Sequence, residues 1–276
     1  MVDTGSAIDS KMFEPYCEMK YADLKVEDLS RKYRSLIDQC AENVPVDAYT
    51  IDSVRKLGWT KILDQAISHS FDVVNALSSG RSVLVQSGGS GFETDAVIAS
   101  LAQIILDPYY RTFDGFCVLL DKEWILQGYK FNSPSHEPFA VLYLFLNCVW
   151  ELMQLHPLSF GFTEDLLIFF LDNVHSKQFS TFIYDNEKER SAKANGTASL
   201  FVFLMNTSNQ ERFINESTNA QLAASTAKGG ALPRSEINPM PWFTTILRWN
   251  PWLRHNTRTT KKELKTVLKV LRYSSL

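Results

Sequence analysis

The stretch SVLVQSGGSGFETDAVIASLAQIILD, residues 82–107, constrains the fold of this chain most. The continuous apolar triplet Val83–Val85 predicts a short strand that is buried on both faces of a sheet. The glycine-rich segment after it predicts a tight turn, and the apolar spacing beyond Thr94 predicts a helix over residues 95–106. A strand, a glycine-rich turn and a helix together form a cradle for a phosphate at a helix N-terminus.

The turn itself lacks the side chains that bind or attack a phosphate. It contains no cysteine, histidine, lysine or arginine. Glu93 and Asp95 instead place carboxylates at the start of the helix, where one acid favours the helix dipole by about 0.3–1 kcal/mol. We therefore expect the protein's own carboxylates to cap this helix, so that a phosphate would have to compete with them.

Other glycine-rich loops fit this turn less well. A serine-hydrolase elbow requires a glycine where Phe92 stands, and a Walker A loop requires a lysine that the turn does not contain. The glycine spacing of a dinucleotide-binding loop is also missing. These three chemistries are therefore disfavoured.

Composition indicates a globular protein with a sizeable core. The chain has 276 residues, of which 45% are hydrophobic, and a net charge of −3, which gives no basic field for nucleic acid. The four cysteines form no CxxC pair, which favours reduced, buried thiols. The histidines are scattered and no metal-binding motif occurs, so we expect no metal and no cofactor. The first residues form no apolar signal segment.

Most of the chain is predicted to be helical. Apolar residues recur at helical spacing in residues 24–42, in residues 50–80 and around residues 116–125. In the second stretch Gly58 either breaks or weakens the helix, the apolar face runs from Trp59 to Val74, and the segment Ser78-Ser79-Gly80 ends it. A further helix is predicted after Thr163, which is a candidate N-cap. The region 186–240 is rich in Asn, Ser, Thr, Ala and Gly, and we expect loops and short elements there.

The longest apolar run, Phe139–Leu155, predicts a central helix. It is apolar nearly all round but is interrupted by Asn147 and Glu151, and a membrane span requires about 20 residues without charge. A buried helix is therefore favoured over a membrane span. The side chains expected to be buried are Phe145, Val149 and Trp150.

Four segments resemble the myotubularin-related phosphoinositide phosphatases, in the same order along the chain. They are VLVQSGGSGFET, SLAQIILDPYYRTFDGFCVLLDKEWILQGYKF, FLNCVWELMQLHPLSFGFTEDLLIFFLDNVHSKQFSTFI and LRWNPWL. The resemblance covers residues 13–271 and is most specific in the second and third segments. Details such as SLAQII and SFGFTEDLLI are most similar to a branch of the family that is catalytically inactive.

The resemblance assigns each position of the turn. Active members carry His-Cys-Ser-Asp-Gly-Trp-Asp-Arg-Thr after the strand, which places Gln86 at the histidine, Ser87 at the cysteine nucleophile and Glu93 at the phosphate-binding arginine. Gly89 and Phe92 stand at the two aspartates. The degenerate loop comprises Gln86, Ser87, Gly88, Gly89, Ser90, Gly91, Phe92, Glu93 and the retained threonine, Thr94.

These replacements predict a loop without catalytic residues. A serine hydroxyl needs a neighbouring base, which Gln86 cannot be, and Glu93 offers no planar fork to a phosphate. We therefore expect this chain not to be an enzyme. The alternative is an atypical phosphoinositide phosphatase that uses Ser87, and a further alternative is a truncated product without activity of its own.

The resemblance implies a tyrosine-phosphatase-like α/β fold with a helix-rich C-terminal part and an incomplete central sheet. Residues 1–255 would be the C-terminal part of an inactive phosphatase domain, and residues 256–276 would begin a truncated coiled coil. In that segment Leu264, Val267 or Leu268, and Leu271 form a seam of about two heptads at most, which is short for a coiled coil.

The implied function is that of a regulatory or adaptor pseudophosphatase. Its partner would be an active phosphatase of phosphatidylinositol 3-phosphate and 3,5-bisphosphate, bound through the coiled coil. We expect no nucleic-acid partner and at most an indirect contact with membranes. The expected location is the cytoplasm, with recruitment to endosomal membranes through the partner.

Overall fold

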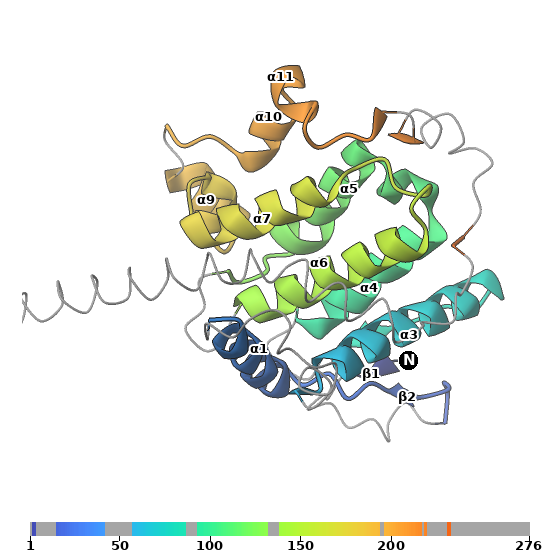
Figure 1. Cartoon of the computed structure of the whole chain (residues 1–276). Coiled ribbons are helices and arrows are strands. Elements are labelled where there is room, and N and C mark those ends of the chain that lie inside the picture. Colours follow the sequence, from blue (N-terminus) through green and yellow to red (C-terminus); the bar gives the residue numbers. More distant parts are fainter. Residues whose placement is uncertain are drawn as a thin grey trace, which may run out of the picture.

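The computed structural model describes residues 2–3, 15–41, 57–86, 93–131, 138–193, 196–216, 218–219 and 231–232. Helices dominate this part of the chain, as expected (Figure 1). The long helices are α1 (Val26–Ala41), α3 (Trp59–Ser78), α4 (Thr94–Leu106), α6 (Pro138–Leu155) and α7 (Glu164–Ser176). The shorter ones are η3 (Pro108–Arg111), α5 (Phe113–Leu120), the π-helix η4 (Asp121–Leu126), α8 (Ser180–Ile183), α9 (Glu187–Lys193), α10 (Leu200–Leu204) and α11 (Thr207–Gln210).

Three two-residue strands form a parallel sheet within the described residues. They are β1 (Val2–Asp3), β2 (Lys20–Tyr21) and β3 (Val85–Gln86), in the order β2-β1-β3. Residue 2 pairs with residue 20 on one side and with residue 85 on the other. The sheet is therefore a small element, and the helices supply most of the core.

The prediction of a buried strand at Val83–Val85 is wrong in its bounds and in its burial. The strand begins at Val85, and Leu84 is 54% exposed while Val83 and Val85 are only partly buried. A continuous apolar triplet indicates burial only when other elements cover both faces of the strand. Here the side chain of Leu84 is open to solvent among the described residues.

The helix α6 forms the centre of the molecule, as its sequence predicts. It contacts α1, α3, α4 and α7, and Figure 1 shows it running through the middle of the protein. Polar groups of α6 form hydrogen bonds with side chains of neighbouring helices. Asn147 accepts a 3.0 Å hydrogen bond from Nε1 of Trp59, and Nε1 of Trp150 donates a 2.8 Å bond to Glu164. The three side chains expected to be buried are fully buried, namely Phe145, Val149 and Trp150.

Several helix boundaries match the sequence pattern. The helix α1 ends one residue before its predicted limit, and α4 begins one residue before its predicted start. Gly58 interrupts the helical conformation directly before α3. Its φ of +70° is not helical, and glycine adopts it without strain. The described helices after residue 186 are short, as expected in that polar region.

Thr163 occupies the N-cap of α7 but does not cap it in the predicted way. No side-chain capping bond forms, and its hydroxyl instead donates a 3.2 Å hydrogen bond to the carbonyl of Arg212. The competing acceptor follows α11, so the local sequence around Thr163 cannot reveal it. The boundary at residue 255 and the predicted coiled coil of residues 256–276 lie outside the described residues.

The central position of α6 gives a test of the architecture. Trp150→Ala should lower the free energy of unfolding by about 3–5 kcal/mol, because it leaves a cavity in the core and removes the hydrogen-bond donor to Glu164. The measurement is the urea midpoint of each variant, followed by circular dichroism. Leu158→Ala, at a position that is 84% exposed, is the control and should change little. Equal midpoints for Trp150→Ala and wild type would show that α6 is peripheral.

Candidate functional site

The glycine-rich turn joins the end of β3 to the start of α4. β3 ends at Gln86, which is partly buried, and α4 begins at Thr94 with Glu93 as its N-cap residue. Residues 87–92, which include Ser87 and the glycines, lie outside the described residues. The structure thus brings together the two ends of the predicted cradle, a parallel strand and a helix N-terminus.

A carboxylate of the protein itself caps the N-terminus of α4. Oδ1 of Asp95 accepts hydrogen bonds from the backbone amides of Glu93, at 2.6 Å, and of Ala96, at 3.0 Å. Free amides at a helix N-terminus are the groups that bind anions. The predicted capping is confirmed for Asp95. It is wrong for Glu93, whose side chain is buried and makes no capping bond.

Thr94 and Tyr129 complete the described part of this end of α4. The Thr94 hydroxyl is buried and has no hydrogen-bond partner among the described residues. Burial raises the pKa of the Tyr129 phenol well above its usual range, and the negative charges of Glu93 and Asp95 raise it further. The phenol therefore keeps its proton near the two carboxylates. Sequence reasoning missed Tyr129, because only tertiary packing brings it to this helix end.

A buried arginine holds the other end of α4. Nη1 of Arg111 donates to the carbonyls of Ile104, at 2.8 Å, and of Ile105, at 3.1 Å. Burial lowers the pKa of this guanidinium to about 10, an effect that the charge of Asp107 opposes. Arg111 stays positive at neutral pH, and a cation at a helix C-terminus is favourable. It therefore stabilises the position of the helix that follows the loop.

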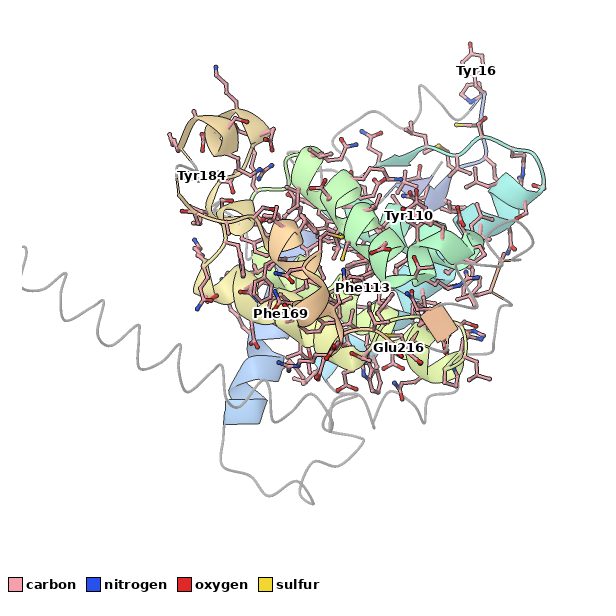
Figure 2. The ribbon with its side chains drawn as sticks, turned by 90° about the horizontal axis from the view of Figure 1, so that it is seen from above. Tyr16, Tyr110, Phe113, Phe169, Tyr184 and Glu216 are labelled. Carbon is pink, nitrogen blue, oxygen red and sulfur yellow. The ribbon has the colours of Figure 1, made fainter. Side chains whose placement is uncertain are left out.

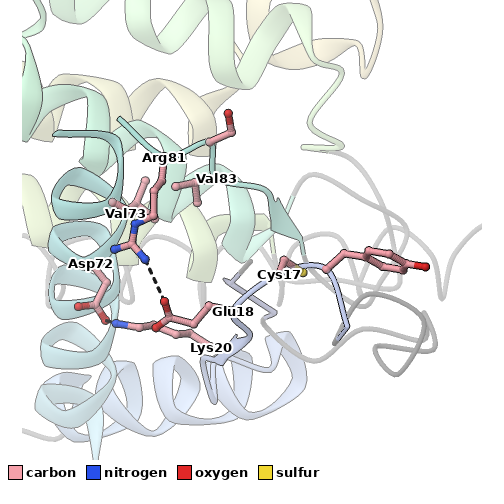
Figure 3. Close-up of a pocket in the computed structure, with 10 residues that line it drawn as sticks. Cys17, Glu18, Lys20, Asp72, Val73, Arg81 and Val83 are labelled. Carbon is pink, nitrogen blue, oxygen red and sulfur yellow. Dashed lines mark hydrogen bonds and ion pairs between the residues drawn. The ribbon is translucent and has the colours of Figure 1, made fainter. Parts of the chain in front are cut away.

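A cavity of about 320 Å³ lies between the segment at β2 and the C-terminal half of α3 (Figure 3). Its charged side chains are paired with one another. Arg81 contacts Glu18 at 2.9 Å, and Lys20 contacts Asp72 at 3.3 Å. The described residues that line this cavity precede β3 in the chain, whereas the glycine-rich turn follows β3.

Tyr16 stands at the rim of this cavity. It is 87% exposed, and Figure 2 shows it projecting from the body of the protein. Because the two described cations that line the cavity, Arg81 and Lys20, already contact carboxylates, the cavity is poorly suited to bind a phosphate. We therefore place the candidate site at the turn and not in this cavity.

Of the cysteines whose side chains the structure describes, Cys17 is partly buried, and Cys117 and Cys148 are buried. Burial raises the pKa of the Cys117 and Cys148 thiols, and an inaccessible, protonated thiol is a poor nucleophile. Among the residues that the structure describes, no three histidine, cysteine or acidic side chains converge as metal ligands would. The described helices include none whose length and apolar character would let it cross a bilayer.

The chain matches the family model of the myotubularin-like phosphatase domain over residues 2–191. It is 27% identical to myotubularin of Xenopus tropicalis, over 91% of this chain and 42% of that protein. It is 31% identical to the phosphatidylinositol-3-phosphate phosphatase MTMR7 of Pongo abelii, over 63% of this chain and 28% of the relative. It is 27% identical to the phosphatidylinositol-3,5-bisphosphate 3-phosphatase MTMR8 of Homo sapiens, over 63% of this chain and 26% of the relative. The chain thus spans less than half the length of these relatives.

The expectation that this chain is not an enzyme is contradicted by these relatives. Two of them are named as phosphoinositide phosphatases, and no contact of the described residues shows a loss of activity. The replacements at Ser87 and Glu93 identify side chains that differ from the active template, but the chemistry of a loop depends on how all its groups are arranged. By its match over most of its length, the chain belongs to the myotubularin-like phosphatase family.

Proposed function

We propose that this chain acts in a phosphatase of 3-phosphoinositides, with the turn between β3 and α4 as the phosphate site and with a tyrosine-phosphatase-like fold. The observation that carries the proposal is the parallel strand that leads through a glycine-rich turn to the N-terminus of α4. The family match and the names of two relatives support the substrate class. Backbone amides at a helix N-terminus suit a phosphate dianion.

Ser87 is the proposed nucleophile in this site. Its Oγ would form a bond to phosphorus while the bond from phosphorus to the inositol oxygen breaks, and water would then release the phosphate from the serine. A serine requires a base to accept its proton. Glu93 and Asp95 supply carboxylates at the end of the loop, which would accept this proton and pass it to the departing inositol oxygen.

Single substitutions in the loop test this nucleophile. Ser87→Ala should abolish the release of inorganic phosphate from vesicles that contain phosphatidylinositol 3-phosphate, because it removes the attacking oxygen. Ser90→Ala, in the same loop, is the matched control and should retain the release. Glu93→Arg should lower KM, since a guanidinium binds phosphate through two parallel hydrogen bonds. Equal phosphate release by wild type and Ser87→Ala, or none by wild type, would contradict the proposal.

A second candidate function is the regulation of another myotubularin-related phosphatase by association. The observation that favours it is Glu93, a buried carboxylate at the position where the resemblance places a phosphate-binding arginine. Its charge opposes phosphate binding, so a second chain could supply the cation that this loop lacks. The segment 256–276 would provide the contact, in the cytoplasm or at endosomal membranes.

Association predicts a binding strength that depends on salt. Isolated helices shorter than about 12–15 residues are marginal in water, so a short seam should hold a homologue only weakly. The lysines that give this segment a basic face are Lys261, Lys262, Lys265 and Lys269. Binding to MTMR8, measured by titration, should therefore weaken with added salt, and a variant with all four lysines changed to glutamine should bind less at low salt. Tight, salt-insensitive binding would show that the globular part carries the interface.

A further inference from the structure

A second cavity, of about 360 Å³, lies between the π-helix η4 and the short helices α8, α9 and α10. Among the described residues, it shares no lining residue with the ends of the glycine-rich turn or with the cavity beside β2. Its volume falls within the range of roughly 300–1,000 Å³ that is typical of small-molecule sites. One wall begins with Asp121, the first residue of η4, and π-helical turns occur frequently at functional sites.

The arginine that lines this cavity is already bound to the protein. Nη2 of Arg190 donates a 2.8 Å bond to the carbonyl of Ile125, and Nη1 donates a 2.8 Å bond to that of Tyr184. Its Nε donates a 3.0 Å bond to Glu187. The guanidinium is buried and joins η4 to α9, so it is poorly placed to bind an added anion. Since Glu187 balances its charge, the carboxylate of Asp121 leaves the described lining of the cavity with a net negative charge.

The hydroxyl groups that line the cavity also use their protons in hydrogen bonds to other groups of the chain. Ser180 Oγ donates to the carbonyl of Ala198 at 3.2 Å, and Ser191 Oγ donates to Glu187 at 3.0 Å. Thr181 and Ser199 share one hydrogen bond of 3.4 Å between their hydroxyls, and the Thr181 oxygen also accepts a 3.0 Å bond from the backbone amide of Leu200. Each hydroxyl has a single proton but two lone pairs. The groups that face the cavity are therefore mainly hydrogen-bond acceptors.

Asp121 is the acidic group of this cavity that lacks a bonding partner among the described residues. It is half-buried, and within the described part of the chain its carboxylate has no hydrogen-bond or ion-pair partner. Burial raises the pKa of this carboxyl, while the nearby guanidinium of Arg190 opposes that shift. A carboxylate that loses water without gaining a donor is destabilised, and a cationic donor relieves this cost.

We propose that this cavity binds a primary ammonium group, which forms an ion pair with Asp121. An ammonium carries three donors and no acceptor, which complements a cavity of acceptors with a net negative charge. Phe201 and Ile125, which also line the cavity, are placed to pack against the methylene groups that carry the ammonium. The ammonium belongs either to a free aliphatic amine or to the lysine side chain of another protein.

Calorimetric titration of the wild-type chain with butylammonium chloride tests the proposal. We expect saturable binding, with 1-butanol binding at least about tenfold more weakly, because the alcohol has the same stem without the charge. Asp121→Asn should weaken the binding of butylammonium by about tenfold or more, since it removes the charge that pairs with the ammonium. Asp114→Asn, which changes an exposed carboxylate of α5 outside the cavity, is the matched control and should leave it unchanged.

The melting temperature separates a binding role of Asp121 from a structural one. Asp121→Asn should keep or raise the melting temperature, because no hydrogen bond or ion pair among the described residues is lost. A lysine-containing tripeptide, N-acetyl-Gly-Lys-Gly-amide, distinguishes the two sources. Tighter binding of the peptide than of butylammonium assigns the site to a partner's lysine, and weaker binding assigns it to a free amine. The proposal would be overturned if neither butylammonium nor the peptide bound saturably, or if 1-butanol bound as tightly as butylammonium. It would also be overturned if Asp121→Asn bound butylammonium as tightly as the wild-type chain does.

Discussion

The burial of α6 over residues 140–152 is the constraint on which the rest of this structure depends. A helix with apolar side chains on every face is stable in water only when other elements surround it. The surrounding elements include α1, α3, α4 and α7, which contact it from different sides. Two hydrogen bonds fix its register against two of them, from Trp59 of α3 to Asn147 and from Trp150 to Glu164 of α7. Because a buried polar group without a partner is costly, these bonds favour one arrangement among many apolar ones.

The same packing positions the candidate site through α4. This helix contacts α6 along its side and is held at both ends, by Arg111 at its last carbonyls and by Asp95 at its first amides. Trp124 of η4 adds a 3.1 Å bond to Ser100 near the middle of α4. A loop that follows a strand and precedes such a helix has both of its ends fixed. The capping by Asp95 also means that a bound phosphate would have to displace, or share amides with, a carboxylate of the protein.

Charged side chains in the described part of this structure mostly find partners within the chain. Arg81 binds Glu18, and Lys20 binds Asp72. Arg190 is surrounded by carbonyls and a carboxylate. These contacts leave few cations for a phosphate in the described residues that line the two cavities. Asp121 differs, since it is half-buried without such a partner. The two proposals therefore concern opposite charges, an anion at the turn after β3 and a cation beside η4.

The sequence by itself determined the helices, the central place of Phe139–Leu155 and the start of α4 near Thr94. Those features depend on apolar periodicity and on helix capping, which are determined by residues close together in the sequence. It also determined the family, because the motifs that carry the resemblance are contiguous in the chain. Its prediction that the chain is not an enzyme was wrong, since it rested on single replacements in one loop.

Only the tertiary structure decided which groups meet across the chain. Leu84 is exposed because no described element covers its face, and Thr163 bonds to the carbonyl of Arg212 instead of capping α7. Tyr129 lies near the carboxylates of Glu93 and Asp95 through packing between segments far apart in sequence. The same kind of packing places Asp121 in a cavity wall without a hydrogen-bond or ion-pair partner among the described residues. Burial and hydrogen-bond partners of this kind depend on packing between distant segments, which local sequence patterns do not encode.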